Sequence, residues 1–323
     1  MTPATVDALG QRAPLSVSVT ILTYKRPEML SANLAGLTGE LGGEAEIIVI
    51  DNSPDDATER VVTKDYPDVR YHRNPKNLGV AGRNLGLASA RGDIVVTLDD
   101  DVTGFGANDL ARIRAVFAED PLLGALCFQV VQPESGVVCN WCHHRDPDLY
   151  ARQTFETYEI SEGAVAYRRS AWERTDGYPE HFFISHEGKD LAFQLMNQGF
   201  AVRYDGSVQV VHHHHDSGRP DWRRYFFDTR NQYWLAARHL PVSMALPYLA
   251  LGTASMGVYS VRDGFLVPFL LGLRDGLQGI PEHLRQRKVL RSEVVRKCQE
   301  IDRFAEGFWP LVRKRLFRKG VRI

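Results

Sequence analysis

Cysteine is scarce in this chain, and no long apolar run stands near its start. The four cysteines, at positions 127, 139, 142 and 298 of 323, are too few and too uneven for a disulfide scaffold. Residues 1–19 lack the basic stretch and apolar segment of a signal peptide, so we expect a cytoplasmic protein with reduced thiols. Cys139, Cys142 and His143 match a haem-attachment pattern. Haem attachment needs export and a structural zinc needs a second ligand pair, so we expect ordinary thiols.

Net charge is also small, at −1, but it is distributed unevenly. From Glu282 to the end, 13 basic residues stand against 5 acidic ones, so this tail carries +8 and the remainder −9. A basic tail beside an acidic body indicates an anionic partner. No groove-reading motif or platform of stacking aromatics accompanies it. We therefore expect anionic lipid, at the inner face of the plasma membrane, and no nucleic acid.

Charged residues are absent from residues 241–261, whose length approaches the ~20 residues of a bilayer span. Pro247, small polar residues and two glycines make this a poor span, and a second apolar stretch follows at 265–273. We expect helices that rest on a membrane surface. A true span and an ordinary helical packing domain or dimer face are the alternatives.

Short apolar runs alternate with helical patterns in the first third of the chain. Strands are predicted at 16–24, 45–53, 68–74 and 93–98, and helices at 26–40, 57–66 and 80–92. This alternation predicts an α/β fold with a mostly parallel sheet flanked by helices. We expect a leader (1–15), a catalytic domain (16–240) whose halves meet near residue 105, and a helical, basic C-terminal region (241–323).

Three aspartates, Asp99, Asp100 and Asp101, follow the last of these strands. Ligands of such sheets bind outside the carboxyl ends of the strands. Alternate residues of an extended segment face the same way, so Asp99 and Asp101 can converge while Asp100 turns aside. A hard divalent cation such as Mg²⁺ or Mn²⁺ makes that convergence favourable. A solvated acidic turn is the alternative.

Four segments, in order, resemble the family 2 glycosyltransferases of GT-A fold; they are residues 17–30, 47–56, 77–101 and 166–200. The resemblance implies an inverting, metal-dependent enzyme that moves a sugar from a nucleotide-diphosphate donor, with UDP or dTDP favoured. The acceptor hydroxyl would belong to a lipid-linked or cell-envelope glycan, or to a small molecule. A non-catalytic nucleotide-sugar or metal-binding protein of this fold is the alternative. A nicotinamide oxidoreductase is disfavoured, because no glycine-rich turn follows the first strand.

The resemblance also assigns the donor site. Thr23, Tyr24 and Arg26 would line the nucleoside pocket, and Asp51 would hydrogen-bond the base. Asn77 and Arg83 would meet phosphate or ribose oxygens at a helix start, together with Asp99 and Asp100. The alternatives are a turn that begins a helix for Tyr24 and Arg26, an Asx turn for Asp51 and a surface ion pair for Arg83.

The same resemblance places the chemistry on a helix that begins near residue 187. Glu187 and Asp190 align with acidic residues of the family, but Gly188 stands at the usual position of the base. We predict Glu187 as the base and Asp190 as the second candidate. Complementing the helix dipole is the alternative role for both.

A run of four histidines, His212 to His215, follows the predicted strand at 207–211. In the family, a histidine after this strand often completes the metal shell. Because strand residues alternate, at most two of the four can face the site, and we predict that His212 joins Asp99 and Asp101. A solvated loop is the alternative. Glu162 and Gly163 would border the donor sugar.

Overall fold

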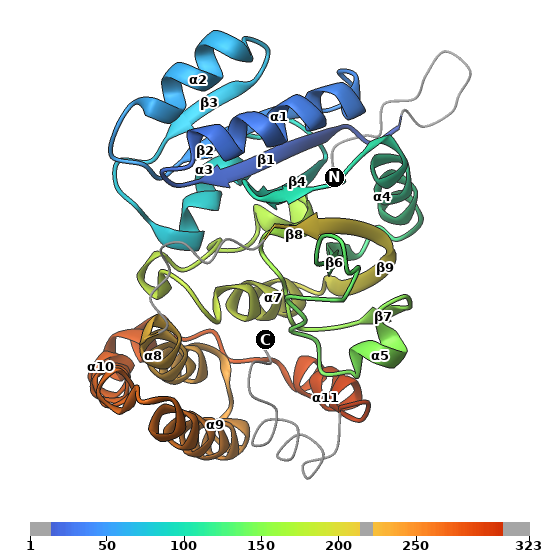
Figure 1. Ribbon diagram of the computed structural model, residues 1–323. Helices are drawn as coiled ribbons and strands as arrows, with labels where there is room; N and C mark the ends of the chain where they lie inside the picture. The colour runs from blue at the N-terminus through green and yellow to red at the C-terminus, as the bar shows by residue number, and fades with distance from the viewer. Residues whose placement is uncertain (1–13, 214–221, 306–323) are drawn as a thin grey trace.

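The computed structural model describes residues 14–213 and 222–305, which contain one mixed sheet of nine strands (Figure 1). Eight strands follow the order β3-β2-β1-β4-β8-β6-β9-β5, and β7 pairs with β9. In the first half, β1 (Val17–Thr23), β2 (Glu46–Asp51), β3 (Arg70–Arg73) and β4 (Ile94–Asp99) are parallel. They are joined by α1 (Pro27–Leu41), α2 (Ala57–Asp65), a 3-10 turn (Gly79–Gly82) and α3 (Arg83–Ser89). The predicted α/β fold is confirmed.

The second half of the sheet is mixed. It contains β5 (Val102–Thr103), α4 (Ala107–Glu119), β6 (Leu123–Val131), α5 (Pro147–Tyr150), β7 (Thr154–Glu156), β8 (Ala164–Arg168), α6 (Arg169–Trp172), a 3-10 turn (Glu180–Phe182), α7 (Glu187–Asn197) and β9 (Ala201–His212). Strand β8 runs antiparallel to both β4 and β6, whereas β6 and β9 are parallel. Because β8 is antiparallel to β4, Gly163, just before β8, lies beside Asp99 at the end of β4.

Both faces of the sheet are buried, which is why its strands read as almost continuous apolar runs. Within β2, Ile48 and Ile50 belong to one core cluster, and Ile47 and Val49 belong to the other. The polar residues at the strand ends therefore lie just beyond the apolar core of the sheet.

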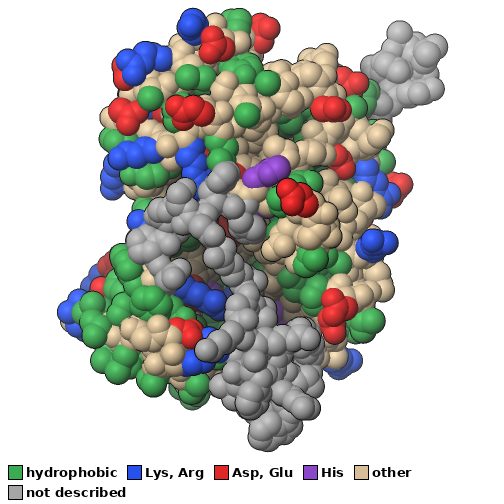
Figure 2. Space-filling model, viewed as in Figure 1, with side chains coloured by type: hydrophobic (Ala, Val, Ile, Leu, Met, Phe, Trp, Pro, Cys, Tyr) green, Lys and Arg blue, Asp and Glu red, His purple; other side chains and the backbone are tan. Residues whose placement is uncertain are grey.

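Four helices follow: α8 (Trp222–His239), α9 (Val242–Asp263), α10 (Leu266–Arg285) and α11 (Ser292–Asp302). Helices α8 and α10 pack closely, since a Cβ at Gly272 would lie 2.4 Å from the Phe226 carbonyl oxygen. Helix α9 is long and apolar enough to cross a membrane, judged by length and composition alone, and hardly any of its apolar stretch is buried. Figure 2 shows hydrophobic side chains gathered over this bundle, at the lower left.

Candidate functional site

The aspartate turn after β4 is held by one asparagine. The side-chain amide of Asn33, on the buried face of α1, donates to the carbonyl oxygens of Asp99 (3.3 Å), Asp100 (3.1 Å) and Val102 (2.9 Å). Those bonds hold the backbone from which the three carboxylates project. Sequence reasoning missed Asn33, although a polar residue among Leu30, Leu34 and Leu37 on one helix face is the signal that marks it.

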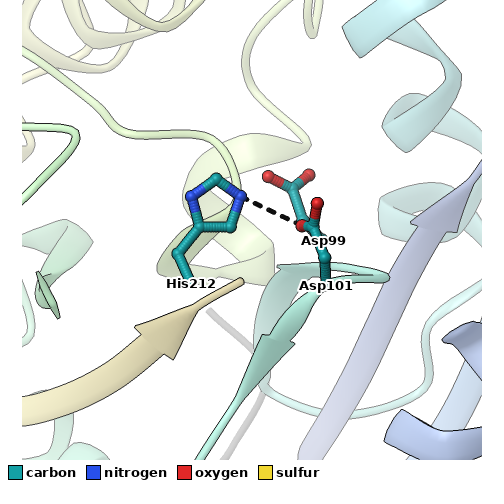
Figure 3. Close-up of side chains that lie close together, drawn as sticks. All are labelled: Asp99, Asp101 and His212. Atoms are coloured by element: carbon teal, nitrogen blue, oxygen red, sulfur yellow. Dashed lines mark ion pairs between the residues drawn. The ribbon is translucent and has the colours of Figure 1, made fainter. Parts of the chain in front are cut away.

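Asp99 and Asp101 converge with His212, as predicted (Figure 3). One ligand atom from each of the three side chains lies within 4.8 Å of the others. His212, at the end of β9, forms an ion pair with Asp101 (3.0 Å), and the Asn140 amide nitrogen lies 3.0 Å from its Nδ1. Asp101 is 4% exposed, so its charge needs a cation close by.

The charges of this cluster are strongly coupled. Burial opposes ionisation of Asp101, but His212 and Arg26 lower its pKa. Burial likewise opposes protonation of His212, but Asp101 and Cys139 raise its pKa. Two carboxylates and an imidazole from separate strands are a suitable donor set for Mn²⁺, so these residues fit a metal ion. His213 faces the other way, with Nε2 2.8 Å from Thr103 Oγ1, and His214 and His215 lie outside the described residues.

Asp100 turns aside, also as predicted. It accepts a hydrogen bond from the Thr23 hydroxyl (2.7 Å), and the Arg26 guanidinium contacts both Asp100 (3.2 Å) and Asp101 (2.8 Å). Burial raises the pKa of Asp100 to about 6, with a further contribution from Asp101. Thr23 and Arg26 therefore contact the aspartate turn itself.

Arg83 is buried and forms an ion pair with Asp99, and it also donates to the Leu98 carbonyl oxygen (3.0 Å). The alternative prediction for Arg83 was an ion pair at the surface. The ion pair forms, but Arg83 is buried. Arg83 holds the Asp99 carboxylate, which keeps 28% exposure. Asn77 is exposed and accepts the Gly79 amide (2.9 Å), so it shapes the turn before α3.

The predicted contact of Asp51 with a nucleobase needs correction. Asp51 is 0% exposed; its carboxylate accepts the Ser53 amide (2.7 Å) and the Tyr71 hydroxyl (2.8 Å). The Asx-turn alternative is the one that forms, because a buried carboxylate must be satisfied by local donors. Tyr24, by contrast, is 43% exposed, and the Lys25 ammonium lies 5.5 Å from its ring centroid; an exposed ring of this kind can stack on a base.

A second acidic group lies where β8 and α7 begin. Glu187 is 3% exposed, and its Oε2 has no hydrogen-bond partner among the described residues. Glu162 is partly exposed, and its carbonyl oxygen accepts the Thr97 hydroxyl (2.7 Å). Burial, together with the charge of Glu162, raises the pKa of Glu187 well above its usual range. Burial raises the pKa of Glu162 to about 7, and Asp99 adds to this increase.

The segment before α7 is conformationally strained. Phe183, Ser185 and His186 have positive φ angles (65°, 79° and 66°), which non-glycine residues rarely adopt. The Asn231 amide, from α8, donates to the carbonyl oxygens of Phe182 (3.0 Å), Ile184 (2.8 Å) and Ser185 (2.8 Å). These bonds hold the strained backbone and thereby fix the start of α7.

Asp190 has a different environment. It is 0% exposed and forms ion pairs with Arg238 (2.7 Å) and His239 (2.9 Å) of α8. Burial alone would raise the pKa of Asp190, but His239 and Arg238 hold it well below its usual range. A base needs a carboxylate that can reach an acceptor and take its proton. Asp190 is buried, so an acceptor cannot reach it, and its lowered pKa disfavours taking up a proton. The geometry therefore does not support Asp190 as the second candidate base.

Cys139 and Cys142 are free thiols. Within the described residues, the one cluster able to hold a metal contains neither of them. His143 packs against Trp141, Phe155 and Tyr204, in the aromatic core.

Comparison with known proteins decides the family. Residues 18–175 match the family model "Glycosyl transferase family 2". The chain therefore contains a family 2 glycosyltransferase domain over these residues. This match covers the aspartate turn and β8, and ends before α7.

Curated relatives of this chain include proteins named as rhamnosyltransferases. The O-antigen chain rhamnosyltransferase WbaN of Salmonella anatum is 29% identical over 196 residues, which cover 56% of this chain and 61% of that protein. The N-acetylglucosaminyl-diphospho-decaprenol L-rhamnosyltransferase of Mycobacterium tuberculosis H37Rv is 24% identical over 259 residues, covering 68% of this chain and 84% of that protein. The chain thus spans about three fifths of the first relative.

Solved structures agree on the fold. The mannosyltransferase PcManGT from Pyrobaculum calidifontis, in complex with GDP-Man and Mn²⁺, aligns with a TM-score of 0.52 at 18% identity and covers 99% of this chain and 92% of that one. S. aureus TarS 1–349 aligns with a TM-score of 0.55 at 17% identity, and the alignment covers 89% of this chain and 88% of that one. The chain therefore has the GT-A fold with a C-terminal helical region.

Proposed function

We propose that this glycosyltransferase moves a sugar from a nucleoside diphosphate donor to an acceptor hydroxyl, with a divalent cation on the donor diphosphate. The observation that carries the proposal is the convergence of Asp99, Asp101 and His212 at the end of β4. Their donor atoms fit Mn²⁺ or Mg²⁺, and a cation bound there would neutralise charge on the leaving diphosphate. PcManGT, which has the same fold, is described with Mn²⁺.

The chain's own residues would do the rest. Arg26, which contacts Asp100 and Asp101 now, lies where it can turn its guanidinium to a diphosphate oxygen. Tyr24 supplies an exposed ring for the base, and UDP and dTDP are the favoured donor nucleotides. Arg83 keeps Asp99 in place. Glu187 was the base predicted from sequence, and it belongs to a carboxyl pair with Glu162.

Rhamnose is the first sugar to test, because two relatives are named as rhamnosyltransferases. One of them is named for an acceptor on diphospho-decaprenol, which supports a lipid-linked, cell-envelope acceptor here. Inversion at the anomeric carbon is expected from the family resemblance.

The test is donor binding followed by turnover. Melting temperature is measured with UDP, dTDP and GDP, each with and without Mn²⁺; a ligand at ~100 times its Kd adds about 2.7 kcal/mol to stability. The matching nucleotide sugars, with dTDP-L-rhamnose first, are then assayed for release of the nucleoside diphosphate. We expect a Mn²⁺-dependent shift with UDP or dTDP, and turnover. Binding without turnover of any nucleotide sugar would favour the non-catalytic alternative.

We further propose that the α9–α10 surface rests on an anionic membrane. Large apolar side chains are exposed along both helices, at Val242, Leu246, Leu251, Val258, Val261, Leu266, Val267, Leu270, Leu271, Leu277 and Leu284. In the sequence, residues 282–323 carry +8, so an anionic lipid headgroup would complement the charge of the segment that begins at the end of α10. A lipid-linked acceptor would then be reached from the membrane surface.

Vesicle sedimentation tests this surface. We expect binding to vesicles containing phosphatidylglycerol, weaker binding to purely zwitterionic vesicles, and a loss of about tenfold or more in the double variant Leu246→Glu, Leu270→Glu. Each buried leucine contributes roughly 1.5–3 kcal/mol. Glu119→Gln, at an exposed position in the last turn of α4, serves as the control. Unchanged sedimentation of the double variant would instead indicate that these helices serve protein contacts.

A further inference from the structure

The position where the family usually has its base cannot carry a side chain in this protein. A Cβ built at Gly188 would lie 2.3 Å from the carbonyl oxygen of Ile160 and 2.2 Å from Oε1 of Glu162. The first contact is with backbone, which cannot move aside as a flexible side chain can. Glycine at this position is therefore a steric requirement of the fold.

The second contact shows what fills the space. The carboxylate of Glu162 occupies the volume that a side chain at Gly188 would take. It arrives from the chain before β8, not from α7, so a carboxylate is present although the sequence lacks one at residue 188. Its place in the sequence is 26 residues earlier, which is why alignment along α7 alone misses it.

Glu162 is also close to the donor end of the site. Its neighbour Gly163 accepts the Asp99 amide (3.3 Å), and a Cβ at Gly163 would lie 2.2 Å from Asp99 Oδ2. The metal-facing carboxylate and Glu162 thus sit on adjoining strand ends. An acceptor hydroxyl that contacts Glu162 would lie beside the donor.

Exposure separates the two members of the pair. Glu187 is 3% exposed, and its Oε2 is buried without a hydrogen-bond partner among the described residues. The charge of Glu162 adds to the rise in the pKa of Glu187 that burial causes. Glu162 is partly exposed, so it is the more accessible member of the pair. Glu187 is therefore better placed to position Glu162 than to touch an acceptor.

We propose that Glu162 is the catalytic base, in place of the acid missing at Gly188, and that Glu187 is a positioning residue behind it. The inference rests on the proposed glycosyl transfer. In the step, the acceptor oxygen forms a bond to the anomeric carbon while its proton passes to the Glu162 carboxylate. The bond from that carbon to the diphosphate oxygen breaks, and its electron pair leaves with the nucleoside diphosphate.

The test compares two nucleophiles. Water has a proton to remove, whereas azide has none, so only the reaction with water needs a base. Release of dTDP from dTDP-L-rhamnose with Mn²⁺, or from whichever nucleotide sugar the wild type consumes, is measured with each nucleophile. For Glu162→Gln we expect the reaction with water to fall roughly 10²–10⁴-fold, the usual contribution of a general base, while the azide reaction stays within a few fold.

Matched variants complete the design. Glu162→Asp keeps a carboxylate and should retain more of the water reaction than Glu162→Gln, and Glu119→Gln should behave as wild type. The Mn²⁺-dependent melting shift with dTDP reports folding and donor binding in each variant. Equal losses with water and azide, or a water reaction within tenfold of wild type, would overturn the assignment to Glu162. No turnover by wild type with any nucleotide sugar would instead overturn the proposed function.

Discussion

The two acidic groups of this site are built in opposite ways. Each carboxylate of the aspartate turn contacts a cationic side chain: Arg83 at Asp99, Arg26 at Asp100, and Arg26 with His212 at Asp101. Among the described residues, neither Glu162 nor Glu187 forms an ion pair, and both have raised pKa values. In the aspartate turn the pKa is raised at Asp100, which turns aside from the candidate metal ligands, and lowered at Asp101. Cations beside a carboxylate favour its ionised form, whereas a buried carboxylate without an ion pair has a raised pKa and takes up a proton more readily. The first group is thus suited to a metal ion and the second to proton transfer.

Asparagine supports both groups in the same manner. Asn33 donates to three carbonyl oxygens of the aspartate turn, and Asn231 donates to three carbonyl oxygens before α7. The backbone is therefore fixed twice by the same chemistry, while the charge environment differs. Function here follows from the partners of each carboxylate, since aspartate and glutamate share one chemistry.

The largest expected effect comes from neutralising the first group. Asp101→Asn should lower turnover by roughly 10³-fold or more, because a metal ion on a leaving diphosphate contributes several kcal/mol to transition-state stabilisation. It should also abolish the Mn²⁺-dependent melting shift with UDP or dTDP. Diphosphate release and differential scanning fluorimetry measure the two effects. Retention of the shift in Asp101→Asn would mean that the metal lies elsewhere.

A third buried carboxylate, Asp190, forms ion pairs with Arg238 and His239 and takes no part in the proposed chemistry. Asp190→Asn leaves Arg238 buried with its ion pair removed, so we expect a loss of about 3–5 kcal/mol in the free energy of unfolding. Urea denaturation measures it. Asp176→Asn is the matched control, since the Asp176–Lys288 pair is about half exposed and should contribute no more than ~1 kcal/mol. Equal losses in both variants would contradict a special role for burial.

The two asparagines should separate binding from turnover. Asn33→Ala should weaken Mn²⁺-dependent nucleotide binding about 10–100-fold, the usual effect of losing a group that orients metal ligands. Asn231→Ala should lower kcat about tenfold at saturating donor, because the loss of roughly 1–2 kcal/mol of hydrogen bonding loosens the start of α7. Titration calorimetry and steady-state kinetics distinguish them. If both variants lose nucleotide affinity and kcat to the same extent, the aspartate turn and the Glu162–Glu187 pair act together and the two roles are not separate.

The smallest effect is the pH dependence of stability without metal. Between pH about 4.5 and 7 the folded protein holds more protons than the unfolded chain at Glu162 and Glu187, so stability should fall as pH rises. Asp190 acts in the opposite direction and in another window: its stabilisation is present above pH about 4 and lost below it. Urea midpoints at pH 5 and 7.5, in EDTA, should differ less in Glu162→Gln than in wild type. An unchanged difference would exclude a raised pKa at Glu162.

Much of the first group was predictable from sequence, because it depends on local periodicity. Because successive side chains of an extended strand point to opposite faces, Asp99 and Asp100 point in opposite directions at the end of β4. His212 and His213 do the same at the end of β9. The second group was only partly predictable. Glu162 fills the space at Gly188 because β8 runs antiparallel to β4, and that reversal has no local signal. Asp51 and Asp190 were misjudged for a related reason: their partners Tyr71 and Arg238 lie 20 and 48 residues away.

Arg26 gives the donor site a built-in counterion. Its guanidinium spans Asp100 and Asp101 at 3.2 Å and 2.8 Å, so without ligand the turn already has a positive charge beside it. A metal ion held at Asp101 would neutralise the carboxylate in place of Arg26, and the Arg26 guanidinium would then be available for an anion. Metal and nucleotide should therefore bind cooperatively, each increasing the affinity for the other by the same factor. The site would then select the metal–nucleotide complex over either component alone.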